Sequence, residues 1–242
     1  MFSLRIPISS SNLDTLKHDL IRALPKVKSS HRVEALARGL GFRSNAALRA
    51  ELQLDTPIAV ILNGNAFLRY LSAHKFNASA IHLYRSAGRI AIQNVLTKIP
   101  QLSMRGFGLG SPERKPDRSR ESLRERQSQL IESRKELLGD DAVEQFLLSL
   151  AFLARVQPTK TIRPNTNSYS LKHMAENFAS ACPDGEKLGP HYVSNGAFIA
   201  AAVHAGFEYE TYVDEFGWYS LNVSFNMAKS SLDILNHENR GR

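Results

Sequence analysis

The sequence predicts a mostly α-helical fold with minor β structure (α+β), in which an N-terminal and a C-terminal helical domain are joined by a charged linker. Apolar residues recur at helical spacings over most of the 242 residues. Short β-like stretches occur only near residues 1–9, 57–62 and 208–225. The charge also changes along the chain. Residues 1–100 hold 14 Lys/Arg against 5 Asp/Glu (+9), whereas residues 137–242 hold 8 against 12 (−4).

The N-terminal domain, residues 1–99, shows apolar stripes that begin after Ser or Asn and stop at Pro or Gly. These residues favour the starts and the ends of helices, respectively. The predicted elements, in order, are a strand within residues 1–9, a helix from Asn12 to Pro25, a helix from Ser29 or Ser30 to Leu40, a helix from Ser44 to Leu52, a strand over residues 57–62, a helix from Asn65 to Phe76, and a helix over residues 79–99.

The spacing within residues 28–52 fits a helix-turn-helix. Gly41 lies where a left-handed residue ends the first helix, and Ala37 lies where the two helices approach closely. Arg43, Ser44, Asn45 and Arg49 then fall on the exposed side of the second helix, from which base and phosphate contacts are made. An ordinary helical hairpin with a solvated polar face is the alternative.

A binding surface for nucleic acid or for an acidic partner is therefore predicted in the basic half. On the helix over residues 79–99, Arg85 and Arg89 lie one turn apart and extend the same electropositive side, unless this face is simply solvated. The predicted binding residues are Lys28, Arg38, Arg43, Ser44, Asn45, Arg49, Arg85 and Arg89.

Residues 100–136 form the predicted charged linker and connector helix. Residues 100–120 are rich in Gly, Pro, Ser and charge, which favours a flexible linker. The glycines of this stretch do not form a phosphate-binding loop, because no Lys-Ser/Thr pair follows them. A highly charged helix is predicted over residues 119–138. Additional basic contacts are assigned to Arg114, Lys115, Arg118 and Arg120.

The C-terminal domain, residues 137–242, is acidic, which argues against nucleic acid there. Its predicted elements are a helix from Asp140 to Leu153, a loop over residues 156–167, a helix from Ser168, an almost uncharged helix from Ser194 or Asn195 to Gly206, a β-hairpin over residues 208–225 that turns at residues 214–217, and a helix from Asn226 to His237.

Chemistry-bearing residues do not form a recognised catalytic pattern. Cys182 is the only cysteine, so neither an internal disulfide nor a cysteine zinc site is expected. His173 and Glu176 lie one turn apart, which fits either a polar helix edge or a metal-binding pair. We therefore predict a protein that is not an enzyme and has no cofactor and no metal.

The residues Ser30, Glu34, Ala37-Arg38, Gly41-Phe42, Leu48 and Ala50 resemble a small helical module of bacterial plasmid, phage and integrated-element proteins. The resemblance covers roughly residues 11–52. Some of these proteins are labelled glyoxalase-superfamily, but the His/Glu metal set of glyoxalases has no counterpart in this sequence. The stretch over residues 192–207 also resembles sequences found in uncharacterised mobile-element proteins. The resemblance implies an origin in a mobile element.

Two functions follow from these features. The first is a non-catalytic, nucleic-acid-associated accessory protein of a mobile genetic element, which binds through the basic N-terminal half. The alternative is an inhibitor of a host defence complex (anti-CRISPR-like) that acts by protein–protein contacts. The expected partner is thus nucleic acid or an acidic or nucleic-acid-containing complex, with a homodimer as a further option. No membrane-length apolar run and no signal-peptide pattern occur, so we expect a cytoplasmic protein.

Overall fold

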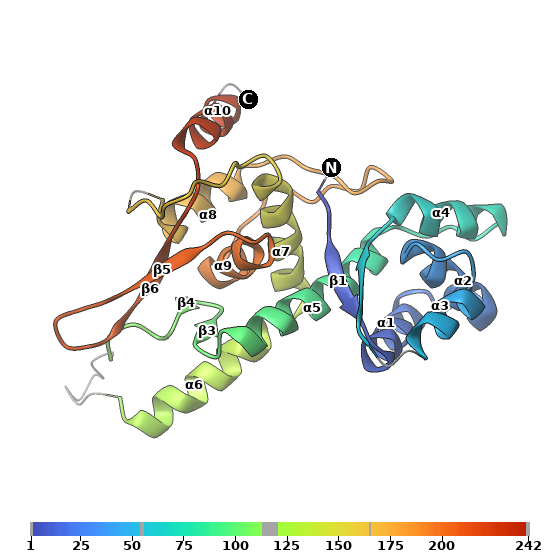
Figure 1. The fold of residues 1–242 in the computed structure, drawn as a ribbon, viewed down its shortest axis with the longest axis horizontal. Coiled ribbons are helices and arrows are strands. Elements are labelled where there is room, and N and C mark those ends of the chain that lie inside the picture. Colours follow the sequence, from blue (N-terminus) through green and yellow to red (C-terminus); the bar gives the residue numbers. More distant parts are fainter. Residues whose placement is uncertain (1, 54–55, 113–120, 165, 241–242) are drawn as a thin grey trace. The chain divides into compact units, whose positions relative to one another are not determined.

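The computed structural model describes residues 2–53, 56–112, 121–164 and 166–240 (Figure 1). Its elements confirm the mostly α-helical prediction, and the strands form small two-stranded antiparallel sheets. The chain divides into two compact units. The N-terminal unit comprises Met1–Ala91 and Ala181–Leu188, and the C-terminal unit comprises Ile92–Ser180 and Gly189–Arg242.

The elements of the N-terminal unit follow the predicted order. They are β1 (Arg5–Ile8), α1 (Ser10–Ala23), α2 (Ser29–Gly39), α3 (Asn45–Leu52), β2 (Ile58–Ile61), α4 (Gly64–Ala73) and the first part of α5 (Ile81–Lys98). Strands β1 and β2 pair antiparallel, with Arg5 opposite Ile61 and Ile8 opposite Ile58. The two β-like stretches of this half therefore form one small sheet.

Two helices of this unit start earlier than the sequence predicts, because a different side chain caps each one. The Ser9 hydroxyl accepts the Asn12 N–H at the start of α1, and the Asn12 side chain instead donates to the Pro7 carbonyl. The Asn63 carboxamide caps α4 by accepting the Ala66 N–H at 2.9 Å. Each true cap precedes its helix directly, which satisfies N–H groups that the helix leaves open.

Close packing of α2 along α4 forms part of the core of this unit (Figure 1). Gly39 permits this approach, since a Cβ there would lie 2.7 Å from Leu83 Cδ2 and 3.2 Å from Phe67 Cβ. Phe67 and Leu83 are both fully buried. Residues of α4 and α5, far away in the sequence, thus pack against α2 and fix the position of the α2–α3 hairpin.

The segment Ala181–Leu188 joins the N-terminal unit across more than a hundred residues. The Asp184 carboxylate accepts the Ala80 N–H at 3.0 Å, directly before α5, and the Ser79 hydroxyl donates to Glu186. Burial raises the pKa of the Asp184 carboxyl, but hydrogen bonds with Ser79 and with backbone N–H groups lower it below its ordinary value. A distant carboxylate therefore serves as the cap of α5.

The C-terminal unit contains the remaining elements. They are the end of α5, β3 (Leu102–Ser103), β4 (Gly106–Phe107), α6 (Leu123–Glu136), α7 (Asp140–Leu153), α8 (Ser168–Glu176), α9 (Asn195–His204), β5 (Tyr209–Val213), β6 (Tyr219–Phe225) and α10 (Lys229–Arg240). Helices α7 and α9 pack against each other, and Phe152 and Phe198 lie between them with ring centroids 6.3 Å apart. The nearly uncharged α9 is buried over most of its length, as its composition predicts.

The stretch after α5 differs from the flexible linker that the sequence predicts. Strands β3 and β4 pair, and Leu102 and Phe107 are buried. Arg134 of α6 donates to the carbonyls of Leu96 and Ile99 at 2.9 and 3.2 Å, so its guanidinium caps the end of α5. Helix α6 is therefore anchored despite its charge. None of the helices in the described part of the chain is both long and apolar enough to cross a bilayer.

Candidate functional site

The four cations predicted on the α2–α3 hairpin are all exposed. Lys28 precedes α2, Arg38 lies near its end, Arg43 lies in the turn and Arg49 lies on α3. No ion pair engages any of them within the described residues. We call Lys28, Arg38, Arg43 and Arg49 the α2–α3 cations. Their charges are available to an anionic partner.

The turn between α2 and α3 contains the predicted left-handed glycine. Gly41 adopts φ +89°, the Phe42 N–H donates to the Ala37 carbonyl at 2.9 Å, and the Gly41 N–H donates to Arg38. This pair of bonds is a Schellman motif, which ends α2. The Glu34 carboxylate then accepts the Asn45 N–H at 3.1 Å. The turn that carries Arg43 is thus fixed by both helices.

Ser44 and Asn45 are less available than the sequence predicts. The Ser44 hydroxyl caps α3 by accepting the Ala47 N–H at 3.1 Å. Asn45 is half-buried, and its Oδ1 is shielded from solvent without a hydrogen-bond partner in the described residues. Both side chains therefore shape the start of α3, and the exposed contacts of this hairpin come from its arginines.

Arg85 and Arg89 differ from the predicted extension of an open electropositive side. The Arg89 guanidinium pairs with the Asp19 carboxylate of α1, and the Ser86 hydroxyl donates to the same carboxylate at 2.9 Å. Arg85 is half-buried. The charge of Arg89 is therefore offset inside the unit, because the Asp19 carboxylate of α1 meets this face of α5. The four predicted linker contacts, Arg114, Lys115, Arg118 and Arg120, lie outside the described residues.

The α2–α3 cations have two different surroundings. Arg49 borders a shallow groove of about 470 Å³ between α1 and α3, where Lys17 also lies. Lys17 pairs with Asp14 at 3.0 Å. Arg38 instead lies near Tyr70 of α4, where its charge partly offsets the burial that raises the pKa of the Tyr70 hydroxyl. The hairpin thus presents cations on two sides, toward α1 and toward α4.

Four aromatic side chains gather beside Arg38, and sequence spacing does not reveal them. We call His31, Tyr70, His74 and Phe76 the ring cluster. The His31 and His74 ring centroids are 4.5 Å apart, and those of Tyr70 and His74 are 4.4 Å apart. His31 Nδ1 lies 3.2 Å from the Tyr70 hydroxyl, and His74 Nδ1–H donates to the Tyr70 carbonyl at 2.8 Å. Burial, followed by the charge of Glu34, raises the pKa of Tyr70.

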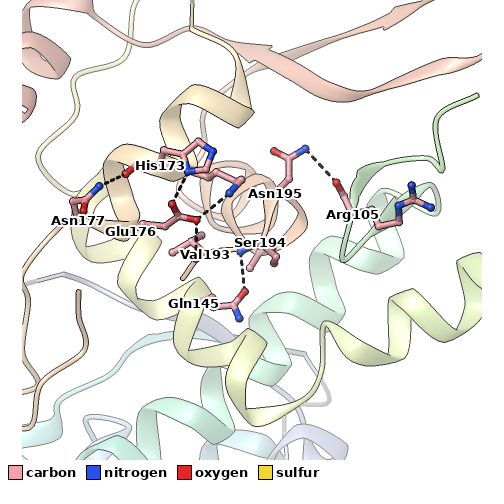
Figure 2. Close-up of polar contacts among 10 residues, drawn as sticks. Arg105, Gln145, His173, Glu176, Asn177, Val193, Ser194 and Asn195 are labelled. Carbon is pink, nitrogen blue, oxygen red and sulfur yellow. Dashed lines mark hydrogen bonds and ion pairs between the residues drawn. The ribbon is translucent and has the colours of Figure 1, made fainter. Parts of the chain in front are cut away.

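A second polar cluster lies in the C-terminal unit, at α8 and the start of α9 (Figure 2). Lys172 is buried, and its ammonium donates to Glu176 Oε1 at 2.9 Å. Glu176 also accepts the Val193 N–H at 3.2 Å and contacts His173 Nδ1 at 2.5 Å. Burial raises the pKa of the Glu176 carboxyl, but hydrogen bonds from Lys172, His173 and Val193 lower it below its ordinary value. These contacts tie α8 to the segment before α9.

His173 and Glu176 therefore meet as a polar pair, which is one of the two predicted alternatives. Within the described ranges, no group of three or more His, Cys, Asp or Glu side chains is arranged to hold a metal ion. Lys172 could have been noticed from the sequence, since it lies four residues after Ser168 and three before Ala175, on the buried side of α8. Cys182 is buried.

The β5–β6 hairpin carries four exposed large apolar side chains, and we call residues 208–225 the acidic hairpin. No Lys or Arg occurs between Lys187 and Lys229, whereas four acidic residues do. The Asp214 carboxylate accepts the Phe216 and Trp218 N–H groups at 3.0 and 2.9 Å, which closes the turn. The exposed apolar side chains are Tyr212, Val213, Phe216 and Tyr219, of which Phe216 is 75% exposed.

No protein-family model, curated protein or solved structure matches this chain. The roles of its residues are therefore inferred from its own geometry and charge.

Proposed function

We propose that this protein is a non-catalytic nucleic-acid-binding protein that uses the exposed cations of its N-terminal unit. The observation that carries this proposal is that the α2–α3 cations are exposed and have no ion pair among the described residues. Cations of this kind neutralise phosphates and release the counterions that surround nucleic acid, which supplies most sequence-independent affinity. The opposite charge of the C-terminal half directs this binding to the N-terminal unit.

Backbone binding is better supported than base reading in a duplex groove. Apart from Arg49, the exposed residues of α3 are mostly small: Ala46, Ala47 and Ala50 lie beside Glu51. Small side chains permit close approach, but they offer few hydrogen bonds to base edges. Asn45, which would read adenine, is half-buried. The arginines therefore position a phosphate backbone in this proposal.

The proposed role is accessory binding within a mobile genetic element, which the resemblance of residues 11–52 supports. Binding is favoured over catalysis because the titratable side chains of the Lys172–His173–Glu176 cluster contact one another. The Glu176 carboxylate already contacts Lys172, His173 and the Val193 N–H, so three of its roughly four lone-pair sites are engaged. A general base needs a free lone pair directed at a substrate proton.

The double substitution Arg43→Ala and Arg49→Ala is expected to weaken binding to a fluorescein-labelled 20-nucleotide strand about tenfold at 50 mM salt. It should also reduce the slope of log affinity against log salt by about 1.4, because two phosphate contacts with a single strand are lost. Fluorescence anisotropy at several salt concentrations measures both quantities.

The matched control is Lys160→Ala with Lys229→Ala, which removes two exposed charges from the C-terminal unit. This control should retain the affinity and salt slope of the unsubstituted protein. Equal binding by the Arg43/Arg49 variant and the unsubstituted protein at low salt would exclude the proposed function.

A second candidate function, inhibition of a host defence complex by protein contact, is favoured by the acidic hairpin. Phe216, Tyr212 and Tyr219 are exposed on it, and aromatic side chains dominate the binding energy of protein interfaces. The neighbouring carboxylates of Glu210 and Glu215 suit a basic patch on the partner. An exposed hairpin of this kind is a suitable protein-binding surface.

Under this alternative, the full chain should retain a protein from nuclease-treated bacterial lysate, and Tyr212→Ala with Phe216→Ala should lose it. Affinity capture followed by mass spectrometry measures this. Substitution of Ile234, an apolar residue of α10 that is 57% exposed, by alanine is the control and should leave capture unchanged. Capture of no stable protein, or equal capture by the hairpin variant, would argue against this role.

A further inference from the structure

The ring cluster combines exposure, ring geometry and nearby positive charge. His74 is exposed, and His31, Tyr70 and Phe76 are half-buried around it. The rings lie within 4.4 to 5.2 Å of a neighbour, measured between centroids. No hydrogen bond engages Nε2 of His31 or of His74 within the described residues. The cluster thus offers open aromatic surface and free imidazole edges.

Two exposed cations accompany the ring cluster, Arg38 on α2 and Lys75 shortly after α4. His31, Glu34 and Arg38 follow one another at spacings of three and four, so they share one face of α2. Lys75 directly follows His74, and it is exposed with φ +63°. Its N–H donates to the Ser72 carbonyl at 2.9 Å, so the end of α4 is fixed there. Arg38 therefore lies near Tyr70, and Lys75 is the chain neighbour of His74.

Glu34 links this cluster to the α2–α3 turn. Its carboxylate accepts the Asn45 N–H and also acts on the Tyr70 hydroxyl pKa. Glu34 and Arg38 both act on Tyr70 through their charges, so both lie near the rings. A strand bound at Arg38 would therefore pass close to the rings.

We propose that the ring cluster is a stacking site for an unpaired nucleobase, so that the ligand of the N-terminal unit is single-stranded nucleic acid. This inference rests on the proposed function, since the cations hold the phosphates while the rings hold a base. Bases stack on His, Tyr and Phe rings when a strand is unpaired, whereas the base faces in a duplex are already covered. Stacking does not depend on sequence, and DNA and RNA strands share this chemistry.

Three nucleic-acid ligands of equal length distinguish base stacking from phosphate binding. They are dT20, an abasic strand with the same phosphates, and a 20-base-pair duplex. The unsubstituted protein should bind dT20 about tenfold more tightly than the abasic strand, as one stacked base predicts. An rU20 strand should behave like dT20. Fluorescence anisotropy at one salt concentration measures these affinities.

The variant His74→Ala should bind dT20 and the abasic strand with equal affinity, and His74→Phe should keep the preference for dT20. His18→Ala removes an exposed histidine of α1 and is the matched control, which should also keep the preference. His74 follows α4 and is exposed, so these variants are expected to fold, and thermal melting by circular dichroism checks this. NMR provides a second measurement: dT20, but not the abasic strand, should shift the imidazole carbon-bound protons of His74.

The outcomes separate the two proposals. Equal binding of dT20 and the abasic strand by the unsubstituted protein would overturn the stacking site and leave phosphate binding supported. Tighter binding of the duplex than of dT20 would overturn it as well. Failure to bind any of the nucleic acids would overturn both the stacking site and the proposed function.

Discussion

Gly196→Ala is expected to unfold the C-terminal unit, or to destabilise it by about 4 kcal/mol or more. Gly196 is the second residue of α9, and its N–H donates to the Met104 carbonyl at 3.1 Å. A Cβ at this position would lie 1.9 Å from the Ser103 carbonyl oxygen and 2.9 Å from Met104 Cα. Because these atoms belong to the backbone, no side-chain rotation relieves the overlap.

The structure offers only costly ways to accommodate that methyl group. Moving α9 away from β3 would break the Gly196–Met104 bond and the bond from Asn195 Nδ2 to the Leu221 carbonyl at 2.8 Å. It would also separate Phe198 from Phe152 and open a cavity in the core. Since α9 and α7 form this core together, the loss should extend through the unit.

Urea denaturation followed by circular dichroism measures this effect. Gly139→Ala is the matched control, because it makes the same chemical change in the same unit at a residue with φ −70°. Its Cβ would come no closer than 3.2 Å to the Glu136 carbonyl, so a change of no more than about 1 kcal/mol is expected. A Gly196→Ala protein as stable as this control would contradict the close approach of α9 to β3.

Local chemistry made the α2–α3 hairpin predictable from the sequence. Gly41 and Ser44 each act through backbone groups within five residues, so their roles are encoded next to them. The acidic hairpin was predictable for the same reason, because alternating residues flank a short turn closed by Asp214. Helix starts were less certain wherever several Ser or Asn residues competed, as at Ser9 and Asn12.

Contacts between residues far apart in the chain could not be predicted from the sequence. No sequence pattern indicates that Asp19 meets Arg89, 70 residues away. The prediction that Arg89 lies on an open side of α5 therefore missed a part-buried ion pair. The capping of α5 by Asp184 is of the same kind. Strands β3 and β4 have only two residues each, which is too short for an alternating pattern to be detected.

The candidate site likewise contains residues that local sequence predicts and residues that only tertiary contacts bring together. The exposed arginines were predictable, because helical spacing alone decides which residues of α2 and α3 face solvent. The ring cluster was not, since His31 on α2 and Tyr70 on α4 are 39 positions apart and meet only in the folded chain. The stacking proposal therefore depends on tertiary structure, whereas the phosphate-binding proposal depends mainly on sequence.

Acidification is expected to weaken the C-terminal unit through His204, by about 2 kcal/mol between pH 7 and pH 5. His204 is half-buried at the end of α9, where its ring meets the Phe146 ring edge-on at 5.6 Å. Burial, and then the charge of Lys98, lowers its pKa from 6.5 to about 4. The unfolded chain consequently takes up a proton between pH 6.5 and pH 4 that the folded chain does not, so stability falls as the pH falls through this window.

His204→Phe should remove this part of the pH dependence, because phenylalanine has a similar shape and does not titrate. Urea denaturation at pH 7, 6 and 5 measures the free energy of unfolding. These pH values lie above the range in which carboxylates such as Glu176 gain protons. Replacement of His237, an exposed histidine of α10, by asparagine is the control and should preserve the slope of the unsubstituted protein. An unchanged slope in His204→Phe would mean that His204 is solvated in the folded chain, and that α9 does not end against Phe146.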